Sequence, residues 1–169
     1  MKYENVILDL DSTLIWSTQE LIKNNANYLP LNIGGKNIYI YIRPYLKEFL
    51  EHCFDKHKTV SLWSLGTKQY VEPVLQILFK LFKITNKFHF IKTNEDSYIF
   101  NNIFDTTPSK SLDKIFEEFP SFNKKNTIFI DDNLDVHDDN HDNIYHIENY
   151  YGDSTDNTLK YLITYLTIV

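Results

Sequence analysis

The chain has 169 residues, a length that favours one domain with a single hydrophobic core over two. Hydrophobic residues make up 43% and charged residues 24% of the sequence, so general disorder is excluded. The formal charge of −6 argues against a broad nucleic-acid-binding surface, because such a surface needs an excess of Lys and Arg.

Several features indicate where the protein works. No stretch approaches the roughly 18 consecutive apolar residues of a membrane span. The N-terminus runs directly into a strand-like segment, so no secretory leader is expected. Cys53 is the only cysteine, which excludes a disulfide framework, so an intracellular location in cytoplasm or nucleus is expected. The sequence has 17 Asn but one Ala and one Arg, a bias typical of an AT-rich genome such as that of a virus or a protist.

The first half of the chain alternates short apolar runs with helical patterns. Strands are expected at residues 6–8, 31–33, 38–42 and 60–63. Gly34-Gly35 joins the middle two as a β-hairpin, since glycine readily adopts the positive φ of such turns. Helices are expected at residues 45–54, directly after Pro44, and around the apolar positions 74, 77, 78 and 81.

The second half repeats this alternation. Strands are expected at residues 88–91, 98–103, 127–130 and 144–147, and helices at residues 111–119 and 155–167. Strands that alternate with helices form α/β domains, so we predict a mostly parallel sheet with helices on both faces and one hairpin near the N-terminus.

Polar side chains follow three of the expected strands where each ends. Asp9 and Asp11 follow the first strand, Ser64 follows the strand at residues 60–63, and Asp131-Asp132 follows the strand at residues 127–130. Ligands collect beyond the carboxyl ends of the strands in such sheets. Four carboxylates at one edge repel each other unless a cation lies between them, and hard oxygen ligands select Mg²⁺.

This set of residues suits phosphoryl transfer. One carboxylate can attack phosphorus while its neighbour transfers a proton to the leaving oxygen. Ser64, at a strand-to-helix turn, can offer its hydroxyl and backbone amides to a phosphate oxygen. Neutralising the phosphoryl group also needs a lysine, for which Lys110 is the candidate and Lys114, one turn further, the alternative.

The segment Asp9-Leu10-Asp11-Ser12-Thr13 matches the DxDxT motif of the haloacid dehalogenase superfamily, whose members have a Rossmann-like fold. More closely, the chain resembles the small C-terminal-domain phosphatases of the FCP/SCP type, which remove phosphate from Ser or Thr, typically in the tail of RNA polymerase II. The matching segments are residues 6–14, 43–50, 70–74, 110–112, 128–132 and 152–159. The resemblance therefore implies that residues 1–169 form a single FCP-like phosphatase domain.

The resemblance also implies a role for each site residue. Asp9 is the expected nucleophile and metal ligand, and Asp11 the general acid and base, with its backbone carbonyl on the metal. The residues expected to hold the phosphoryl group are Ser64, Lys110 and Thr13. Asp132 is expected to bind Mg²⁺ directly, with Asp131 beside it orienting Lys110 or a metal-bound water. The implied substrate is a phosphorylated Ser/Thr protein or peptide, and the RNA polymerase II tail is one candidate.

Two departures from the family pattern affect substrate choice more than chemistry. Ser64 stands where relatives often have Thr, which keeps the hydroxyl. Lys92 stands where small phosphatases often have Arg, and Lys cannot form the same bidentate contact.

The gaps from Asp11 to Ser64 and from Ser64 to Lys110 are too short for a separate cap domain, so an open site is expected. The aromatic segment at residues 88–100 is the expected wall of a peptide groove.

Two other functions use the same residues. One is a phosphatase of small molecules or polynucleotide ends, and the other is a non-catalytic adaptor that binds phosphopeptides. The complete set of Asp9, Asp11, Lys110 and Asp132 argues against the adaptor, which needs neither a nucleophile nor its metal. The spacing of His137 and His141 resembles that of metal ligands, but their Asp/Asn-rich segment predicts a solvated loop. The sequence leaves the oligomeric state open.

Overall fold

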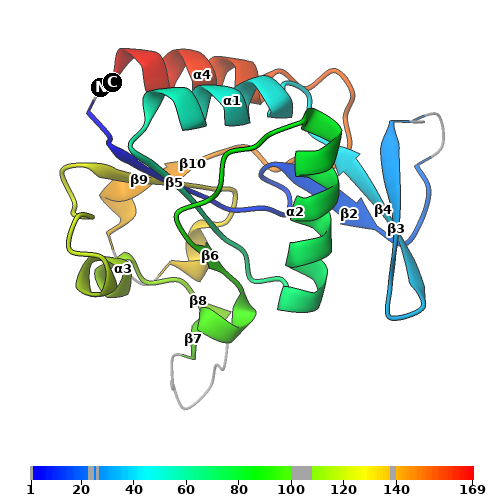
Figure 1. The fold of residues 1–169 in the computed structure, drawn as a ribbon, viewed down its shortest axis with the longest axis horizontal. Coiled ribbons are helices and arrows are strands. Elements are labelled where there is room, and N and C mark those ends of the chain that lie inside the picture. Colours follow the sequence, from blue (N-terminus) through cyan, green and yellow to red (C-terminus); the bar gives the residue numbers. More distant parts are fainter. Residues whose placement is uncertain (1, 23–24, 26, 100–107, 138–139) are drawn as a thin grey trace.

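The computed structural model describes residues 2–22, 25, 27–99, 108–137 and 140–169. Its centre is a five-stranded parallel sheet in the order β10-β9-β1-β5-β6 (Figure 1). The strands are Asn5–Leu8 (β1), Thr59–Trp63 (β5), Ile91–Lys92 (β6), Thr127–Asp131 (β9) and Ile144–His146 (β10). The predicted α/β class with a parallel central sheet is confirmed.

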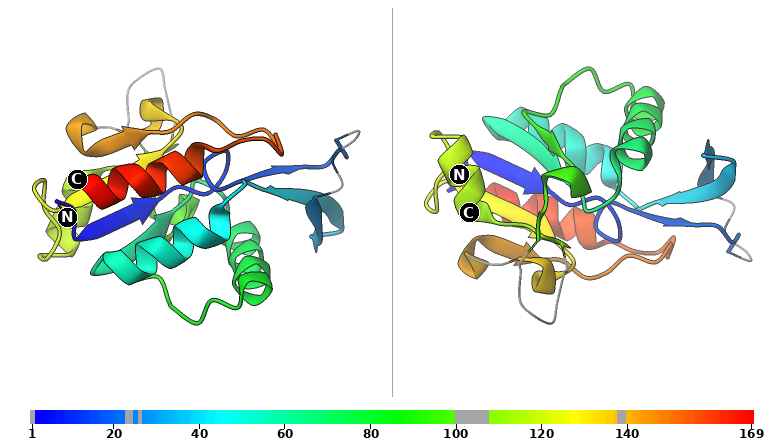
Figure 2. Two further views of the ribbon diagram at one scale, coloured as in Figure 1. Left: turned by 90° about the horizontal axis from the view of Figure 1, so that it is seen from above. Right: turned by 90° about the horizontal axis from the view of Figure 1, so that it is seen from below.

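Helices cover both faces of this sheet, as predicted. Alternate strand residues point to opposite faces, so Val6 and Leu8 of β1 enter one core and Ile7 enters the other. The helices of the first core are α1 (Leu46–Lys56), α2 (Lys68–Phe82) and α4 (Thr158–Ile168), and the second core contains α3 (Leu112–Glu118). Seen from above, α1 and α4 lie side by side across their face of the sheet (Figure 2).

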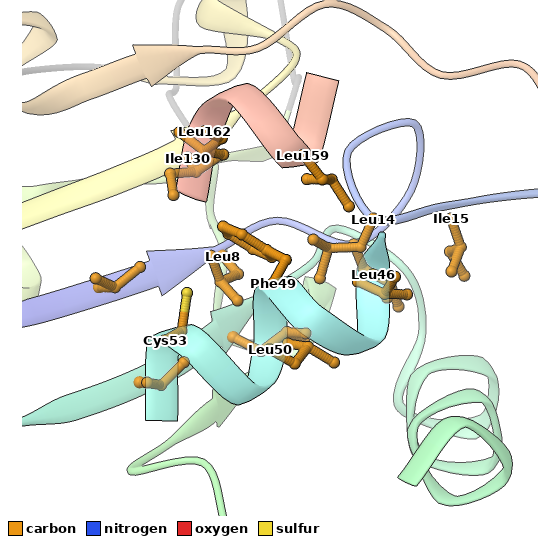
Figure 3. Packing of buried hydrophobic residues seen from close by; sticks show 14 of the residues in the cluster. Leu8, Leu14, Ile15, Leu46, Phe49, Leu50, Cys53, Ile130, Leu159 and Leu162 are labelled. Carbon is orange, nitrogen blue, oxygen red and sulfur yellow. The ribbon is translucent and has the colours of Figure 1, made fainter. Parts of the chain in front are cut away.

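The first core explains why residues 45–54 read as a helix. Its apolar residues recur every three or four positions, and Leu46, Phe49, Leu50 and Cys53 are all buried. Phe49 and Cys53 point from α1 toward Leu8 of β1, and α4 lies beside α1 on the same face of the sheet (Figure 3). Cys53 is therefore a packing residue, and burial raises the pKa of its thiol.

After β1, the chain forms a second, antiparallel sheet that is separate from the central one. Strands β3 (Tyr28–Ile33) and β4 (Lys36–Ile42) form the predicted hairpin, with Gly34 and Gly35 both at positive φ. A third strand, β2 (Ile15–Thr18), pairs with β4 and extends the hairpin to three strands. This strand was not predicted because only its first two residues are large and apolar.

The prediction for residues 88–91 is wrong apart from its last residue. Only Ile91 and Lys92 form the strand β6 beside β5. The backbone just before them still contacts β5, because the N–H of His89 donates to the carbonyl of Val60 at 2.8 Å and the N–H of Leu62 donates to the carbonyl of Phe90 at 3.0 Å. The two phenylalanines of this segment pack in different places. Phe88 contacts the ring of Phe79 on α2, whereas Phe90 stacks on Phe119 beyond α3. The next strands are short, Tyr98–Ile99 (β7) and Pro108–Ser109 (β8). Most of the strand expected at residues 98–103 lies outside the described residues.

Three single-turn helices complete the described chain: η1 (Asn94–Asp96), η2 (Leu134–Val136) and η3 (His141–Asn143). Of the helices in the described ranges, none combines the length and the apolar character needed to cross a membrane.

Candidate active site

The residues predicted to form the site meet at the carboxyl edge of the central sheet. All of them except Thr13 line one cavity of about 230 Å³. Asp9 and Asp11 come from the end of β1, Ser64 from the end of β5, and Asp131 and Asp132 from the end of β9. The parallel register of the three strands explains why residues so far apart in sequence share one cavity.

Lys110, directly after β8, is the lysine that reaches the site. Its Nζ lies 2.7 Å from Asp9 Oδ1 and 2.7 Å from Asp131 Oδ2, and its side chain is 2% exposed. Burial lowers the pKa of Lys110, but attraction to these two carboxylates outweighs it, so the pKa is raised and the ammonium stays charged. Lys114 instead contacts Glu117 on the exposed side of α3.

The aspartates nearest to Lys110 have opposite pKa shifts. Burial raises the pKa of Asp9, and the lysine offsets this only in part. Burial also acts on Asp131, but Lys110 and His137 outweigh it, so the pKa of Asp131 is lowered. The raised pKa of Asp9 means that Lys110 alone does not offset the cost of burying an ionised Asp9, so a further positive charge in the cavity would favour the ionised form.

This arrangement fits a divalent cation. Carboxylate oxygens of Asp9, Asp131 and Asp132 lie within 4.8 Å of one another. Oxygen donors of this kind suit Mg²⁺. Both oxygens of Asp131 are already engaged, one by the backbone N–H of Asn133 and the other by Lys110 and His137. Asp131 is also only 1% exposed, whereas Asp132 is half-buried. Among the hydrogen bonds of the described residues, Asp9 accepts on one oxygen only, from Lys110. Asp9 and Asp132 are therefore better placed than Asp131 to contact a metal ion directly.

The carboxylate of Asp11 has different partners. The Tyr70 hydroxyl donates a hydrogen bond to Asp11 Oδ1, and the Ser17 hydroxyl donates to the same oxygen at 3.3 Å. Burial raises the pKa of Asp11 although these hydrogen bonds oppose it. A raised pKa favours the protonated form, which suits a carboxyl group that gives a proton to a leaving oxygen. Neither Tyr70 nor Ser17 was predicted, although Tyr70 begins one of the segments that resemble the family.

Thr13 holds Asp132 in place. Its hydroxyl donates to Asp132 Oδ1 at 2.9 Å and accepts the backbone N–H of Asp132 at 3.1 Å. Asn149 donates to the other carboxylate oxygen of Asp132 at 2.8 Å. Thr13 is fully buried and is not among the residues that line the cavity. This placement differs from the phosphate-binding role expected for Thr13 and makes it a support for Asp132.

Ser64 and the turn after it close another side of the cavity. The Ser64 hydroxyl accepts the backbone N–H of Gly66 at 2.9 Å. A Cβ at Gly66 would lie 2.8 Å from the ring of Tyr70, so glycine allows α2 to bring Tyr70 against Asp11. Lys92 is not among the residues that line the cavity, because its ammonium pairs with Glu118 at 2.7 Å.

The expectation of a solvated loop is wrong for His137. Its side chain is fully buried, and its Nε2 lies 2.9 Å from Asp131 Oδ2. The Asp/Asn-rich composition did not predict this, because Val136 at the end of η2 and His137 after it are buried, whereas the nearby acidic residues Asp135 and Asp142 are exposed. His141 is exposed and contacts only the backbone carbonyl of His137 among the hydrogen bonds of the described residues.

Sequence comparison finds relatives named as phosphatases. The chain is 33% identical over 75 residues to the human carboxy-terminal domain RNA polymerase II polypeptide A small phosphatase 2, covering 43% of this chain and 27% of that protein. It is 32% identical over 77 residues to CTD small phosphatase-like protein 1 of Caenorhabditis elegans, covering 44% of this chain and 16% of that protein. The matched segments are thus less than a third of these relatives.

Structural comparison finds the same fold over nearly the whole chain. Fcp1, described as an essential RNA polymerase II CTD phosphatase, superposes with a TM-score of 0.64 at 23% identity, covering 98% of this chain and 49% of that one. The fission yeast Fcp1 bound to beryllium fluoride gives a TM-score of 0.65 at 22% identity, covering 98% and 50% of the two chains.

The family model described as NLI interacting factor-like phosphatase matches residues 4–169. This match includes every element of the central sheet and every residue of the cavity. The chain belongs to the family of NLI interacting factor-like phosphatases.

Proposed function

We propose that this chain is a Mg²⁺-dependent protein serine/threonine phosphatase that works through an aspartyl-phosphate on Asp9, with residues 1–169 as a single catalytic domain. The observation that carries the proposal is the meeting of Asp9, Asp11, Lys110 and Asp132 around one cavity in a member of this family. An adaptor that only binds phosphopeptides has no use for a buried nucleophile beside a second carboxyl group. An intracellular location, in cytoplasm or nucleus, stays a prediction.

The proposed reaction has two displacements at phosphorus. A carboxylate oxygen of Asp9 forms the new bond to phosphorus while the bond to the serine or threonine oxygen breaks, and Asp11 gives that oxygen its proton. Asp11 then takes a proton from water, whose oxygen displaces Asp9 and releases phosphate. Lys110 and the Ser64 hydroxyl would hold the phosphoryl oxygens. Mg²⁺, held by Asp9, Asp132 and the backbone carbonyl of Asp11, would offset the charge of carboxylate and phosphate when bound.

Metal dependence gives a direct test of the cation site. Chelation with EDTA should abolish phosphatase activity and added Mg²⁺ should restore it. Asp132→Ala should raise the Mg²⁺ concentration needed for half-maximal activity by roughly ten- to hundredfold, because it removes a direct ligand. Asp142→Ala, which removes an exposed carboxylate of η3, is the control and should behave as wild type. Activity that survives exhaustive chelation would contradict the proposal.

The surroundings of the cavity favour a peptide over a small molecule. The described residues between Asp11 and Ser64 form β2, β3, β4, α1 and β5, which supports an open site. Along α2, beyond Tyr70, the side chains of Leu75 and Phe79 line an apolar groove of about 500 Å³ together with Phe88 and Ile91. This groove lies on part of the segment expected to bind peptide, whereas Phe90 turns away from it.

A comparison of substrates tests this preference. We expect kcat/KM for a phosphoserine-proline peptide to exceed that for any free nucleotide or sugar phosphate by at least about tenfold, or roughly 1.4 kcal/mol of transition-state binding. The RNA polymerase II tail is the candidate source of such a peptide, since the human relative and Fcp1 are named for it. Equal or faster turnover of a metabolite or of a polynucleotide end would favour the small-molecule function instead.

A further inference from the structure

His137 is a buried side chain of the site to which the mechanism above assigns no role. Its ring donates toward Asp131, and Asp131 in turn contacts the phosphate-binding lysine. We propose that His137 is a positioning residue that fixes the carboxylate of Asp131, so that Asp131 anchors Lys110 beside the nucleophile. The proposal rests on the function proposed above, because it describes how that site is held.

The backbone brings His137 and Lys110 to the same oxygen. The two residues form a parallel β-bridge, in which the N–H of Lys110 donates to the carbonyl of Val136 at 2.7 Å. Residues paired in this way project their side chains to the same side. Both side chains accordingly end at Asp131 Oδ2, Lys110 at 2.7 Å and His137 at 2.9 Å.

The ring of Phe129 contacts the side chains of both His137 and Lys110. It lies two residues before Asp131 on β9, so the two side chains share a face of the sheet. The ring of His137 meets the ring of Phe129 edge-on with centroids 4.7 Å apart, and the ammonium of Lys110 lies 5.1 Å from the same centroid. Phe129 is fully buried, which leaves these three side chains little freedom to move.

Three donors determine the orientation of the Asp131 carboxylate. The backbone N–H of Asn133 donates to Oδ1 at 2.8 Å, and His137 and Lys110 donate to Oδ2. If the imidazole were removed, Lys110 would be the only one of these three donors left on Oδ2. The ammonium also contacts Asp9 at 2.7 Å, so a looser Asp131 would let Lys110 shift relative to the nucleophile and the phosphate.

The proposal requires one tautomer of the imidazole. A carboxylate accepts hydrogen bonds, so Nε2 must carry a proton to contact Asp131. Within the described residues, Nδ1 is buried and has no hydrogen-bond partner. Long-range ¹H–¹⁵N NMR of the wild-type protein should therefore show a proton on Nε2 of His137. A neutral ring with its proton on Nδ1 would overturn the proposal without any mutant.

Variants of His137 test the consequence for phosphate binding. His137→Phe keeps an aromatic ring against Phe129 but removes the donor, whereas His137→Gln keeps a donor of similar reach. In the presence of Mg²⁺, we expect His137→Phe to weaken orthophosphate binding, measured by calorimetry, by about tenfold and to raise KM more than it lowers kcat. His137→Gln should recover most of the loss. His141→Phe, which changes a neighbouring exposed histidine, should match wild type.

The outcomes separate this proposal from the proposed function. Wild-type affinity in His137→Phe, or equal losses in His137→Phe and His137→Gln, would overturn the positioning role. If His137→Phe does not fold, the comparison of His137→Gln with wild type and the NMR measurement decide. If the wild-type protein lacked phosphatase activity, the proposed function would fail, but phosphate affinity and the tautomer would still report on His137.

Discussion

Asp9→Asn is expected to lower kcat for a phosphopeptide by at least about 10³-fold. The amide has the shape of the carboxylate and can still accept a hydrogen bond from Lys110, but it lacks the anion that attacks phosphorus. Hydrolysis of phosphate monoesters is among the slowest uncatalysed reactions, so loss of the covalent step should have a large effect. Because Lys110 and Ser64 remain, phosphate should still bind in part.

Trapping experiments can show the role of Asp9 directly. The wild-type protein should form a phosphoenzyme that hydroxylamine cleaves, as expected of an acyl phosphate, and should bind beryllium fluoride in the same cavity. Asp9→Asn should do neither, and Asp142→Asn should do both. Near-normal turnover by Asp9→Asn would show that the mechanism is wrong, even if the metal dependence held.

The position of the carboxylates could be predicted because it follows from topology. Asp9, Asp11, Asp131 and Asp132 each follow a short apolar run, and parallel strands bring their carboxyl ends to one edge. Ser64 followed from the same reasoning. These residues required no knowledge of loops or of side-chain packing, and all of them line the cavity.

The supporting residues could not be predicted in this way because they depend on packing between elements. Tyr70 contacts Asp11 only because α2 approaches β1 closely at Gly66. His137 contacts Asp131 only because its segment pairs with Lys110 through one β-bridge. The sequence around His137 is rich in Asp and Asn. This composition correctly predicts that the nearby Asp135 and Asp142 are exposed, but it does not predict that the ring of His137 is buried.

The same limit applies to the edges of the fold. The strand β6 has only two residues, and the aromatic side chains before it pack into two different cores, which no alternation pattern reveals. β2 is held by pairing with β4, and its polar residues Ser17 and Thr18 gave no strand signal. Ser17 nevertheless reaches Asp11 from that strand, so an unpredicted element supplies a contact in the site.

The only arginine of the chain contacts the backbone of Thr13, a residue that supports the site. Its substitution is expected to have the largest effect on stability. Arg43 is fully buried and forms two hydrogen bonds with Asp156, through Nε at 3.0 Å and Nη2 at 2.9 Å. It also donates to the backbone carbonyls of Thr13 at 2.9 Å and Glu148 at 2.8 Å. The guanidinium therefore joins the C-terminal segment to the loop that carries Thr13, which in turn holds Asp132.

Arg43→Met should lower the free energy of unfolding by about 3–5 kcal/mol, measured by denaturant titration. The cause is the loss of one partner of a buried ion pair, which leaves the carboxylate of Asp156 without its cation and two carbonyls without their donor. Thr158 still donates to Asp156, but it carries no charge. Arg43→Lys should lose less, because the charge remains but the planar bidentate contact does not. The control is Lys68→Met, which removes an exposed pair with Glu72 at 3.7 Å and should change stability by less than about 1 kcal/mol. Equal stability of Arg43→Met and Lys68→Met would show that the buried pair does not hold the C-terminal segment to the site.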